Sequence, residues 1–389
     1  MLLREPDLLL WVLYLVLFPV YVFENGLPQP GDLLILPLAP IVIARWSGRV
    51  DVPAKRAITW LLGFTLYTLV SAMLWTAVEG ELAINLKIGF LLSPLFYIYN
   101  ALAFLLVLLM HRAHGERFIT ITVYTTLIVV LLQVPLSALI GRHTGSRATG
   151  LFNNPNQLGY YAVLSASIII FGQRRANVST LLGAAGMLAC TYLALISASK
   201  AAIVSVGLLI LISSVTRLRT ILASIAVATV LVLTVPPLAT ALELSRDRIE
   251  SDEHASFLLE RGYDRIWQHP EYWVLGSGEG AYRRFEHTTV IGDHELHSSG
   301  GTLFFCYGIA GSLVFLGFLF QVIRGAQLRQ VVLLIPAAAY GLTHQGLRVT
   351  LLWVLLAMFL ILGDRARRSK RSPATPPGRL VGEPRLRRA

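Results

Sequence analysis

Apolar stretches recur along almost the whole chain, and they constrain its fold more than any other feature. Each approaches the roughly 20 residues that a helix needs to cross a bilayer. In lipid every backbone N–H and C=O must be paired within the protein, and a helix achieves this within one segment. The sequence therefore predicts an all-α, polytopic integral membrane bundle of about twelve helices, with spans near residues 8–23, 31–44, 57–76, 92–110, 118–140, 157–172, 179–197, 201–215, 220–241, 302–323, 330–345 and 349–363.

The composition agrees with this class and excludes a soluble globular enzyme. Hydrophobic residues occupy 55% of the 389 positions and charged residues 14%, whereas soluble domains have about 25% charged residues. Cys190 and Cys306 both lie in apolar stretches, which favours packed thiols over a disulfide or a nucleophile. Residues 8–23 are not followed by a small-residue cleavage site, so we expect a retained span rather than a signal peptide.

The distribution of arginine and lysine predicts the orientation of the bundle. With the N-terminus in the cytoplasm, most of the 33 basic residues fall on that side, as the positive-inside rule requires. Both termini are then cytoplasmic. Residues 364–389 are rich in arginine and proline and predict a disordered tail that contacts anionic lipid headgroups rather than nucleic acid.

Several basic residues lie on the opposite, outer side, where topology selection disfavours them. Those in the large loop 243–300 share it with many acids, so surface ion pairs explain most of them. Arg142, Arg147, Lys200 and Arg348 instead lie in short connections with hardly any acid nearby. We expect these four cations to form an anion-binding pocket, for which a lipid phosphate or diphosphate is the natural ligand.

The loop 243–300 contains three patterns with candidate roles. Residues 254–269 mix apolar and charged side chains, as in a helix that lies on the membrane surface or packs over the bundle. The glycine string of residues 276–280 lacks the context of a phosphate-binding P-loop, which favours a plain turn. The histidines and acids of residues 287–297 invite a metal site, but an HExxH motif would need histidine where Ser298 stands, and we expect no metal.

His297 differs from the other histidines in its position along the chain. The next apolar span begins a few residues later, so Ser298 or Ser299 is expected to cap that helix. The positive end of the helix disfavours a charged imidazole. A neutral histidine beside a cationic pocket suits a general base that activates a hydroxyl group. The alternative is an ordinary histidine at the membrane boundary.

Three passages resemble the O-antigen ligase and polymerase superfamily of membrane glycosyltransferases. From His297 to Gly311, a His-Ser pair followed after nine residues by G-x-x-G is similar to the histidine signature at the end of the family's periplasmic loop. Arg261, with the aromatic, His-Pro and glycine elements of residues 263–280, is similar to the segment before that histidine. Residues 147–156 (RATGLFNNPN) resemble the family's RxxxL motif and the asparagine-rich stretch that follows it.

The resemblance covers about residues 145–363 and departs from the family at one position. The family usually has arginine after a Ser-x-Ser sequence at the outer end of a middle span, whereas here residues 197–199 precede Lys200. Lysine keeps the charge but lacks the bidentate fork of arginine. We therefore divide the chain into N-terminal membrane helices (1–140), a catalytic membrane region (141–363) and the basic tail (364–389).

The resemblance implies a metal-independent, inverting transfer of a glycan, without a cofactor. The donor is an oligosaccharide on undecaprenyl diphosphate, and the acceptor is a sugar hydroxyl on the periplasmic side of a bacterial inner membrane. In this hypothesis the catalytic residues are His297, which accepts the proton of the acceptor hydroxyl, and Arg261, which helps to neutralise the departing diphosphate. The expected ligands of the diphosphate and glycan are Arg147, Lys200, Arg348, Asn153, Asn154, Asn156, Arg142 and His344.

Two alternatives remain open at this point. Nothing selects a large lipid acceptor, which favours a polymerase over an O-antigen ligase that moves finished chains onto a lipid A core. A transporter or flippase for lipid-linked sugars would share many spans and a basic outer cavity, but it is expected to show paired broken helices or inverted halves. The sequence contains no pattern that identifies the sugar, the linkage, the acceptor or the oligomeric state.

Overall fold

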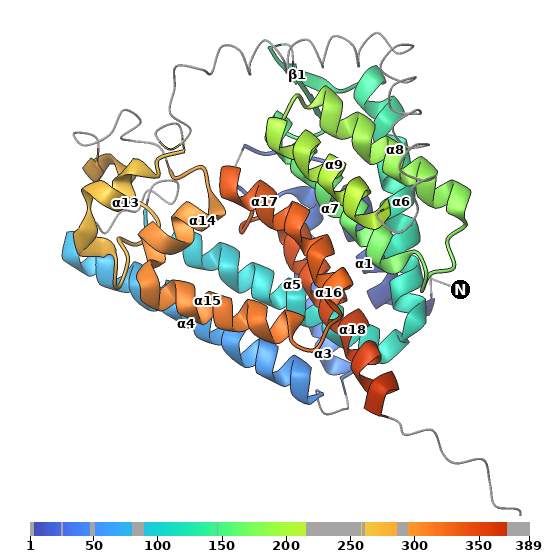
Figure 1. Cartoon of the computed structure of the whole chain (residues 1–389), viewed down its shortest axis with the longest axis horizontal. Helices are drawn as coiled ribbons and strands as arrows, with labels where there is room; N and C mark the ends of the chain where they lie inside the picture. Colours follow the sequence, from blue (N-terminus) through green and yellow to red (C-terminus); the bar gives the residue numbers. More distant parts are fainter. Residues whose placement is uncertain are drawn as a thin grey trace, which may run out of the picture.

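The apolar stretches fold into helices that pack side by side (Figure 1). The computed structural model describes residues 4–24, 26–46, 51–79, 89–145, 147–214, 258, 261–285 and 295–371. Each predicted span within these residues coincides with one to three helical elements, whereas the expected span 220–241 lies outside them. Up to residue 214 the helices are α1 (Pro6–Leu17), α2 (Pro30–Leu33), α3 (Ile35–Ala44), α4 (Val52–Glu79), α5 (Leu92–His114), α6 (Glu116–Leu139), α7 (Pro155–Gly172), α8 (Thr180–Ile196) and α9 (Lys200–Ser214).

Four helical segments among the described residues are long and apolar enough to cross a membrane. They are α4, α5, α6 and the run Ser299–Ile323, while the other apolar helices are shorter. The fold is thus mainly helical and consistent with a helical membrane protein. The remaining helical elements are α13 (Asp264–Gln268), η3 (Pro270–Tyr272), η4 (Tyr282–Phe285), α14 (Ser299–Gly301), η5 (Thr302–Cys306), α15 (Tyr307–Ile323), α16 (Leu328–Val331), η6 (Val332–Leu334), α17 (Ile335–Thr343) and α18 (Thr350–Arg371).

The first helix begins and the last helix ends at the same end of the bundle, here called the tail end (Figure 1). Asp7 at the start of α1 contacts Arg45 after α3 at 2.6 Å and His114 at the end of α5 at 2.7 Å. Arg117 in the first turn of α6 contacts Glu5 at 2.7 Å. These ion pairs hold the helix ends together. The opposite end, with the strand hairpin and residues 261–285, is called the loop end.

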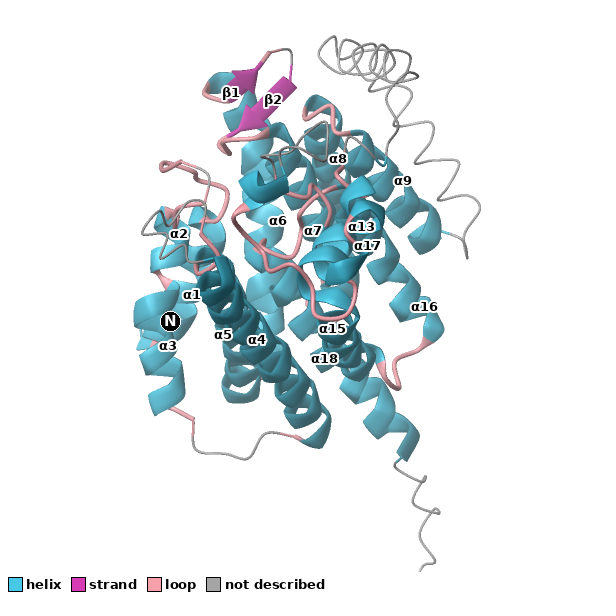
Figure 2. Cartoon of the chain, turned by 90° about the vertical axis from the view of Figure 1, so that its left-hand side faces the viewer, coloured by secondary structure: helices cyan, strands magenta, loops and turns pink. Residues whose placement is uncertain are grey.

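A two-stranded antiparallel hairpin, β1 (Arg142–Thr144) and β2 (Arg147–Gly150), lies at the loop end (Figure 2). The asparagine-rich stretch after it starts α7. Asn154 accepts a hydrogen bond from the backbone N–H of Asn156, and Pro155 occupies the first helical position. Asparagine at the cap and proline directly after it are the residue types that favour a helix start. This local signal places β2 next to the beginning of α7.

Helix α7 occupies the centre of the bundle, since most of its residues are buried on all sides. It packs against α6, α8, α9 and α18. At Gly159 a Cβ atom would come within 2.8 Å of Ala202 and 2.9 Å of the Ser197 hydroxyl. The absence of a side chain there lets the start of α9 approach α7 closely, which brings residues 197–200 next to residues 147–156.

The predicted tenth span, seen as α14, η5 and α15, is broken near the loop end. Its middle part, η5, is a π-helix, and Gly308 leaves the helical conformation with φ 63°. Such a break frees backbone groups that must find other partners. Residues 273–278 supply them: Ser277 and Gly278 donate to the carbonyls of Phe305 and Cys306, and Ile309 and Ala310 donate to the carbonyls of Trp273 and Val274.

The glycine string therefore forms a packed turn, as expected. At Gly276, which has φ 83°, a Cβ atom would lie 2.3 Å from the carbonyl oxygen of Cys306. At Gly280 it would lie 2.9 Å from the backbone of Gly89. Only glycine allows both the left-handed backbone and this close approach. The turn serves to seat the loop on the broken helix.

Candidate cationic site at the loop end

Arg147 on β2 is held between the starts of α7 and α9. Its Nε donates to the carbonyl of Ser197 at 3.0 Å, and one terminal nitrogen donates to Oδ1 of Asn156 at 2.8 Å. Both of these acceptors are uncharged groups, and together they orient the guanidinium. The sequence motif around residues 147–156 and the Ser-x-Ser segment thus meet in space.

Lys200 is the first residue of α9 and follows a tight turn. Ala198 has φ 44°, a left-handed conformation that non-glycine residues rarely adopt. The hydroxyl of Ser197 accepts a hydrogen bond from the backbone N–H of Ser199 and stabilises the turn. Because Arg147 is bonded to Ser197, the turn brings the beginning of α9 and its half-buried lysine to the Arg147 segment.

His344 follows the last residue of α17 and packs on a tyrosine stack. The rings of Tyr160 and Tyr340 lie parallel with centroids 4.2 Å apart, and the His344 ring lies 4.8 Å from Tyr340. The Tyr340 hydroxyl donates to the backbone carbonyl of Asn156 at 2.6 Å. Asn156 therefore contacts both Arg147 and the stack that supports His344.

The pKa of His344 depends on its burial and on three nearby ionisable side chains. Burial is the main cause that lowers the pKa of His344, and Arg261, His297 and Arg147 lower it further, to about 3. The imidazole is therefore neutral at physiological pH. The three neighbours come from three segments that are far apart in the sequence.

Tyr263 fixes the turn that carries Arg261. Its hydroxyl donates to the carbonyl of Leu342 at 2.8 Å and is hydrogen-bonded to the hydroxyl of Ser298. Ser298 also caps α14 by accepting from the backbone N–H of Gly301 at 3.0 Å, which confirms the predicted cap. The loop helix and the residue after His297 are thus tied to the end of α17.

A second tie joins this segment to His344. Both the backbone N–H and the hydroxyl of Ser299 donate to the carbonyl of His344 at 3.1 Å. The side chain of His297, two residues earlier, is exposed. We call Arg147, Arg261, His297 and His344, with Lys200 at the adjacent start of α9, the cationic site.

Three predicted binding residues lie outside the cationic site. Arg142 is exposed on β1 and donates to Oδ1 of Asn153 at 3.3 Å. Asn153 in turn donates to the carbonyl of Phe23 at 2.6 Å, which ties the hairpin to the segment after α1. Asn154 caps α7. In the structure these side chains stabilise the loop end of the bundle.

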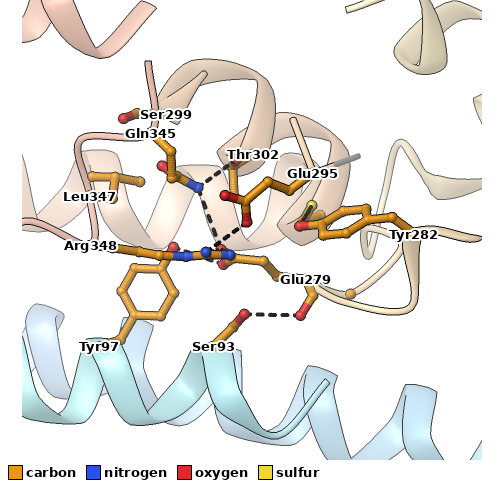
Figure 3. A network of polar contacts seen from close by, with 12 residues as sticks. Ser93, Tyr97, Glu279, Tyr282, Glu295, Ser299, Thr302, Gln345, Leu347 and Arg348 are labelled. Carbon is orange, nitrogen blue, oxygen red and sulfur yellow. Dashed lines mark hydrogen bonds and ion pairs between the residues drawn. The ribbon is translucent and has the colours of Figure 1, made fainter. Parts of the chain in front are cut away.

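Arg348 belongs to a separate cluster, in which two carboxylates surround it (Figure 3). Its Nε and one terminal nitrogen donate to Oε1 of Glu279, and the other terminal nitrogen donates to Glu295 at 2.7 Å. The sequence predicts few acids near Arg348, and this prediction is wrong, because Glu279 and Glu295 both contact it. Its guanidinium is neutralised by residues that are distant in the sequence, and sequence spacing gives no sign of this.

Glu279 is the centre of this cluster and is only 2% exposed. Its Oε2 accepts hydrogen bonds from the hydroxyls of Tyr97 on α5 and Tyr307 at the start of α15. Gln345 approaches Oε1 at 3.4 Å, and Ser93 donates to the Glu279 carbonyl. Figure 3 shows these groups converging from the loop, α5 and the connection before α18. Sequence reasoning missed Glu279, whose only signal is an acid between two glycines.

The structure describes Glu295 and His297 of the predicted histidine-rich segment. His287, Asp293 and His294 lie outside the described residues. Within the residues that the structure describes, no group of three or more His, Cys, Asp or Glu side chains is placed to hold a metal ion. Only α13, Asp264–Gln268, represents the helix expected over residues 254–269, most of whose first half also lies outside the described part.

Comparison with known proteins adds no relative to this picture. No protein-family model matches the chain, and a search of curated proteins finds none that is similar. The bundle and the geometry of its cationic site are therefore the basis for an assignment of function.

Proposed function

We propose that this protein is a membrane glycosyltransferase of the polymerase type. It would move a glycan from an undecaprenyl-diphosphate-linked donor to a sugar hydroxyl on the periplasmic face of a bacterial inner membrane. The observation that carries this proposal is that hydrogen bonds join the segments of Arg147, Arg261 and His297 to His344 and the tyrosine stack beside it. In the proposal, about twelve helices span the membrane, both termini are cytoplasmic, and the loop end is periplasmic.

The chemistry requires a base, a set of cations and an energy-rich donor. No ATP is available outside the cytoplasm, so the diphosphate ester of the donor supplies the energy. His297 takes the proton of the acceptor hydroxyl, and the oxygen attacks the anomeric carbon from the face opposite the leaving group. The bond from that carbon to the diphosphate oxygen breaks, and its electron pair leaves with undecaprenyl diphosphate. Arg147 and Arg261 stabilise the charge of the departing diphosphate, without a metal ion.

His344 has a binding role in this proposal. An imidazole that stays neutral offers one donor and one acceptor nitrogen. Beside Arg147 and Arg261 it can accept from a sugar hydroxyl or donate to a phosphate oxygen without adding charge. Its support by the Tyr160–Tyr340 stack keeps the ring in place.

A transporter remains the competing class, and the broken helix bears on it. In secondary transporters the ends of broken helices line a substrate cavity. Here the groups freed by the break are bonded to residues 273–278. The sequence also lacks the paired broken helices or inverted halves expected of such a transporter, so we favour the enzyme.

The proposal is tested in the native host with the gene deleted and then restored in variant forms. His297→Ala should behave like the deletion, with single repeat units in place of the glycan ladder on gels and in mass spectra. His143→Ala is the control, because His143 is an exposed histidine on β1 at the same end of the bundle. Long chains left on the lipid carrier would indicate a ligase, and a normal ladder from His297→Ala would contradict glycan transfer.

A further inference from the structure

The length of α4 is used to place residues at the loop end relative to the hydrocarbon core of the bilayer. The helix has 28 residues, so it is about 42 Å long at 1.5 Å per residue, and it exceeds the roughly 30 Å hydrocarbon core of a bilayer. Lys55 and Arg56 are exposed near its beginning and belong at the membrane boundary of the tail end. From Arg56 to Glu79 the helix measures about 35 Å, so only about 5 Å project beyond the core at the loop end.

Part of the loop lies beside α4 at a level inside this core. The Tyr67 hydroxyl donates to the carbonyl of Leu275 at 2.8 Å, and the indole nitrogen of Trp75 donates to the carbonyl of Gly276 at 3.1 Å. The two side chains bracket residues 275–276 about 12 Å before the end of α4, hence about 7 Å inside the hydrocarbon core. Figure 1 shows the segment around α13 covering this end of α4.

The outward side chains of this segment are apolar. Val274 is 64% and Leu275 57% exposed, and Trp273 presents part of its ring beside them. These residues continue the exposed apolar side of α4, with Val70 and Met73, and that of α15, with Ile309 and Leu313. Between the two helices runs an apolar groove, lined by Thr59, Trp60, Gly63, Leu66, Tyr67, Val70 and Val314, and Tyr67 lies at its junction with Leu275.

Several polar groups of the segment are paired within the protein, as irregular backbone at membrane depth requires. The carbonyls of Trp273 and Val274 accept from Ile309 and Ala310, and Ser277 donates to the carbonyl of Phe305. The indole nitrogen of Trp273 donates to the carbonyl of Ile266. The segment can therefore face acyl chains without leaving these groups unpaired.

We infer that residues 273–279 form a re-entrant segment embedded in the bilayer, with Trp273, Val274 and Leu275 against the acyl chains of the leaflet at the loop end. Trp267 on α13, 66% exposed and with its ring 6.2 Å from that of Trp273, lies at the headgroup level. Tryptophan is enriched at this boundary because its ring is amphipathic. The partner of this surface is thus phospholipid, and the loop 243–300 is only partly aqueous.

The test measures the depth of residue 275 in the full chain in phospholipid nanodiscs. A nitroxide is attached to Leu275→Cys, and its collisions with oxygen and with a water-soluble nickel chelate are compared. Cys190 and Cys306 are buried and do not compete for the label. Leu313→Cys serves as the lipid-facing control, and Thr144→Cys on the exposed strand β1 as the aqueous control.

The ratio of oxygen to nickel collisions at residue 275 should match that at 313 and exceed that at 144 several-fold. A ratio like that at 144 would overturn the inference.

A second measurement serves if the Leu275→Cys variant fails to fold. Lipids brominated on the acyl chain should quench a smaller fraction of the tryptophan emission in Trp273→Phe than in the wild type. Trp353→Phe removes a buried tryptophan as the control. An unchanged quenched fraction in Trp273→Phe would also contradict the inference, and neither result depends on glycan transfer.

Discussion

His344 has a chemical state that only its surroundings explain. Burial, followed by Arg261, His297 and Arg147, lowers its pKa from 6.5 to about 3. An unfolded chain binds a proton at this histidine below about pH 6.5, whereas the folded chain does so only near pH 3. The residue therefore makes the protein less stable as the pH falls through this window.

This shift predicts a pH-dependent stability. Between pH 6 and pH 4 the free energy of unfolding should fall by up to about 1.4 kcal/mol per pH unit because of His344. His344→Gln should remove this part of the slope. Thermal unfolding in nanodiscs at several pH values measures it, and identical slopes for the variant and the wild type would contradict the described surroundings of His344.

Arg147 predicts a difference between arginine and lysine in the cationic site. Arg147→Lys cannot reproduce the two contacts to Ser197 and Asn156, and a lost charged hydrogen bond costs about 1.5–3 kcal/mol. Transfer should therefore fall at least about tenfold. Lys200→Arg should keep or raise it, since arginine retains the charge.

Glycan formation in the complemented deletion host compares these variants. Arg174→Lys is the control, because Arg174 is exposed in the turn between α7 and α8, far from residues 147–156 in the bundle. Wild-type product from Arg147→Lys would contradict a role for the guanidinium fork.

At the scale of elements, Glu279 joins the loop to three parts of the bundle. It contacts Tyr97 on α5, Tyr307 on α15, and Arg348 before α18. Removing one partner from a buried ion pair usually costs about 3–5 kcal/mol. Glu279→Gln keeps some hydrogen bonds and Arg348 keeps Glu295, so we expect a loss near 3 kcal/mol.

The melting temperature of the purified variant measures this loss. Glu271→Gln is the matched control, since Glu271 is 55% exposed and its ion pair is with His269. Equal melting temperatures for the two variants would show that Glu279 does not anchor the loop.

Hydropathy predicts the helical elements well but not their interruptions. Residues 302–323 are mostly apolar and carry no charged side chain, so the hydropathy pattern does not reveal the π-helix or the turn at Gly308. The break is stabilised by residues 273–278, which are about thirty positions earlier and look like an ordinary glycine-rich turn. A local signal did predict one helix start: Ser298 or Ser299 was expected to be the cap, and Ser298 caps α14, because capping depends on neighbouring residues only.

At the scale of the whole molecule, the cationic site is assembled from segments that lie between the hairpin and the last connection. The motifs name Arg147, Arg261 and His297 in advance, and hydrogen bonds in the bundle join their segments to His344 and its tyrosine stack. The same reasoning cannot separate Arg348 from them, because its partner Glu279 is 69 residues away. A basic residue in a short connection can be recognised in the sequence. An acid that pairs with it from a distant part of the chain cannot.

The most direct test of glycan transfer uses purified protein in nanodiscs with lipid-linked repeat units from the native host. Mass spectrometry follows released undecaprenyl diphosphate and lengthened glycan together. The wild type and His143→Ala should form both products, whereas His297→Ala should form neither while retaining the wild-type melting temperature. Lengthened glycan from a folded His297→Ala at the wild-type rate would contradict the proposed role of this histidine and the site built around it.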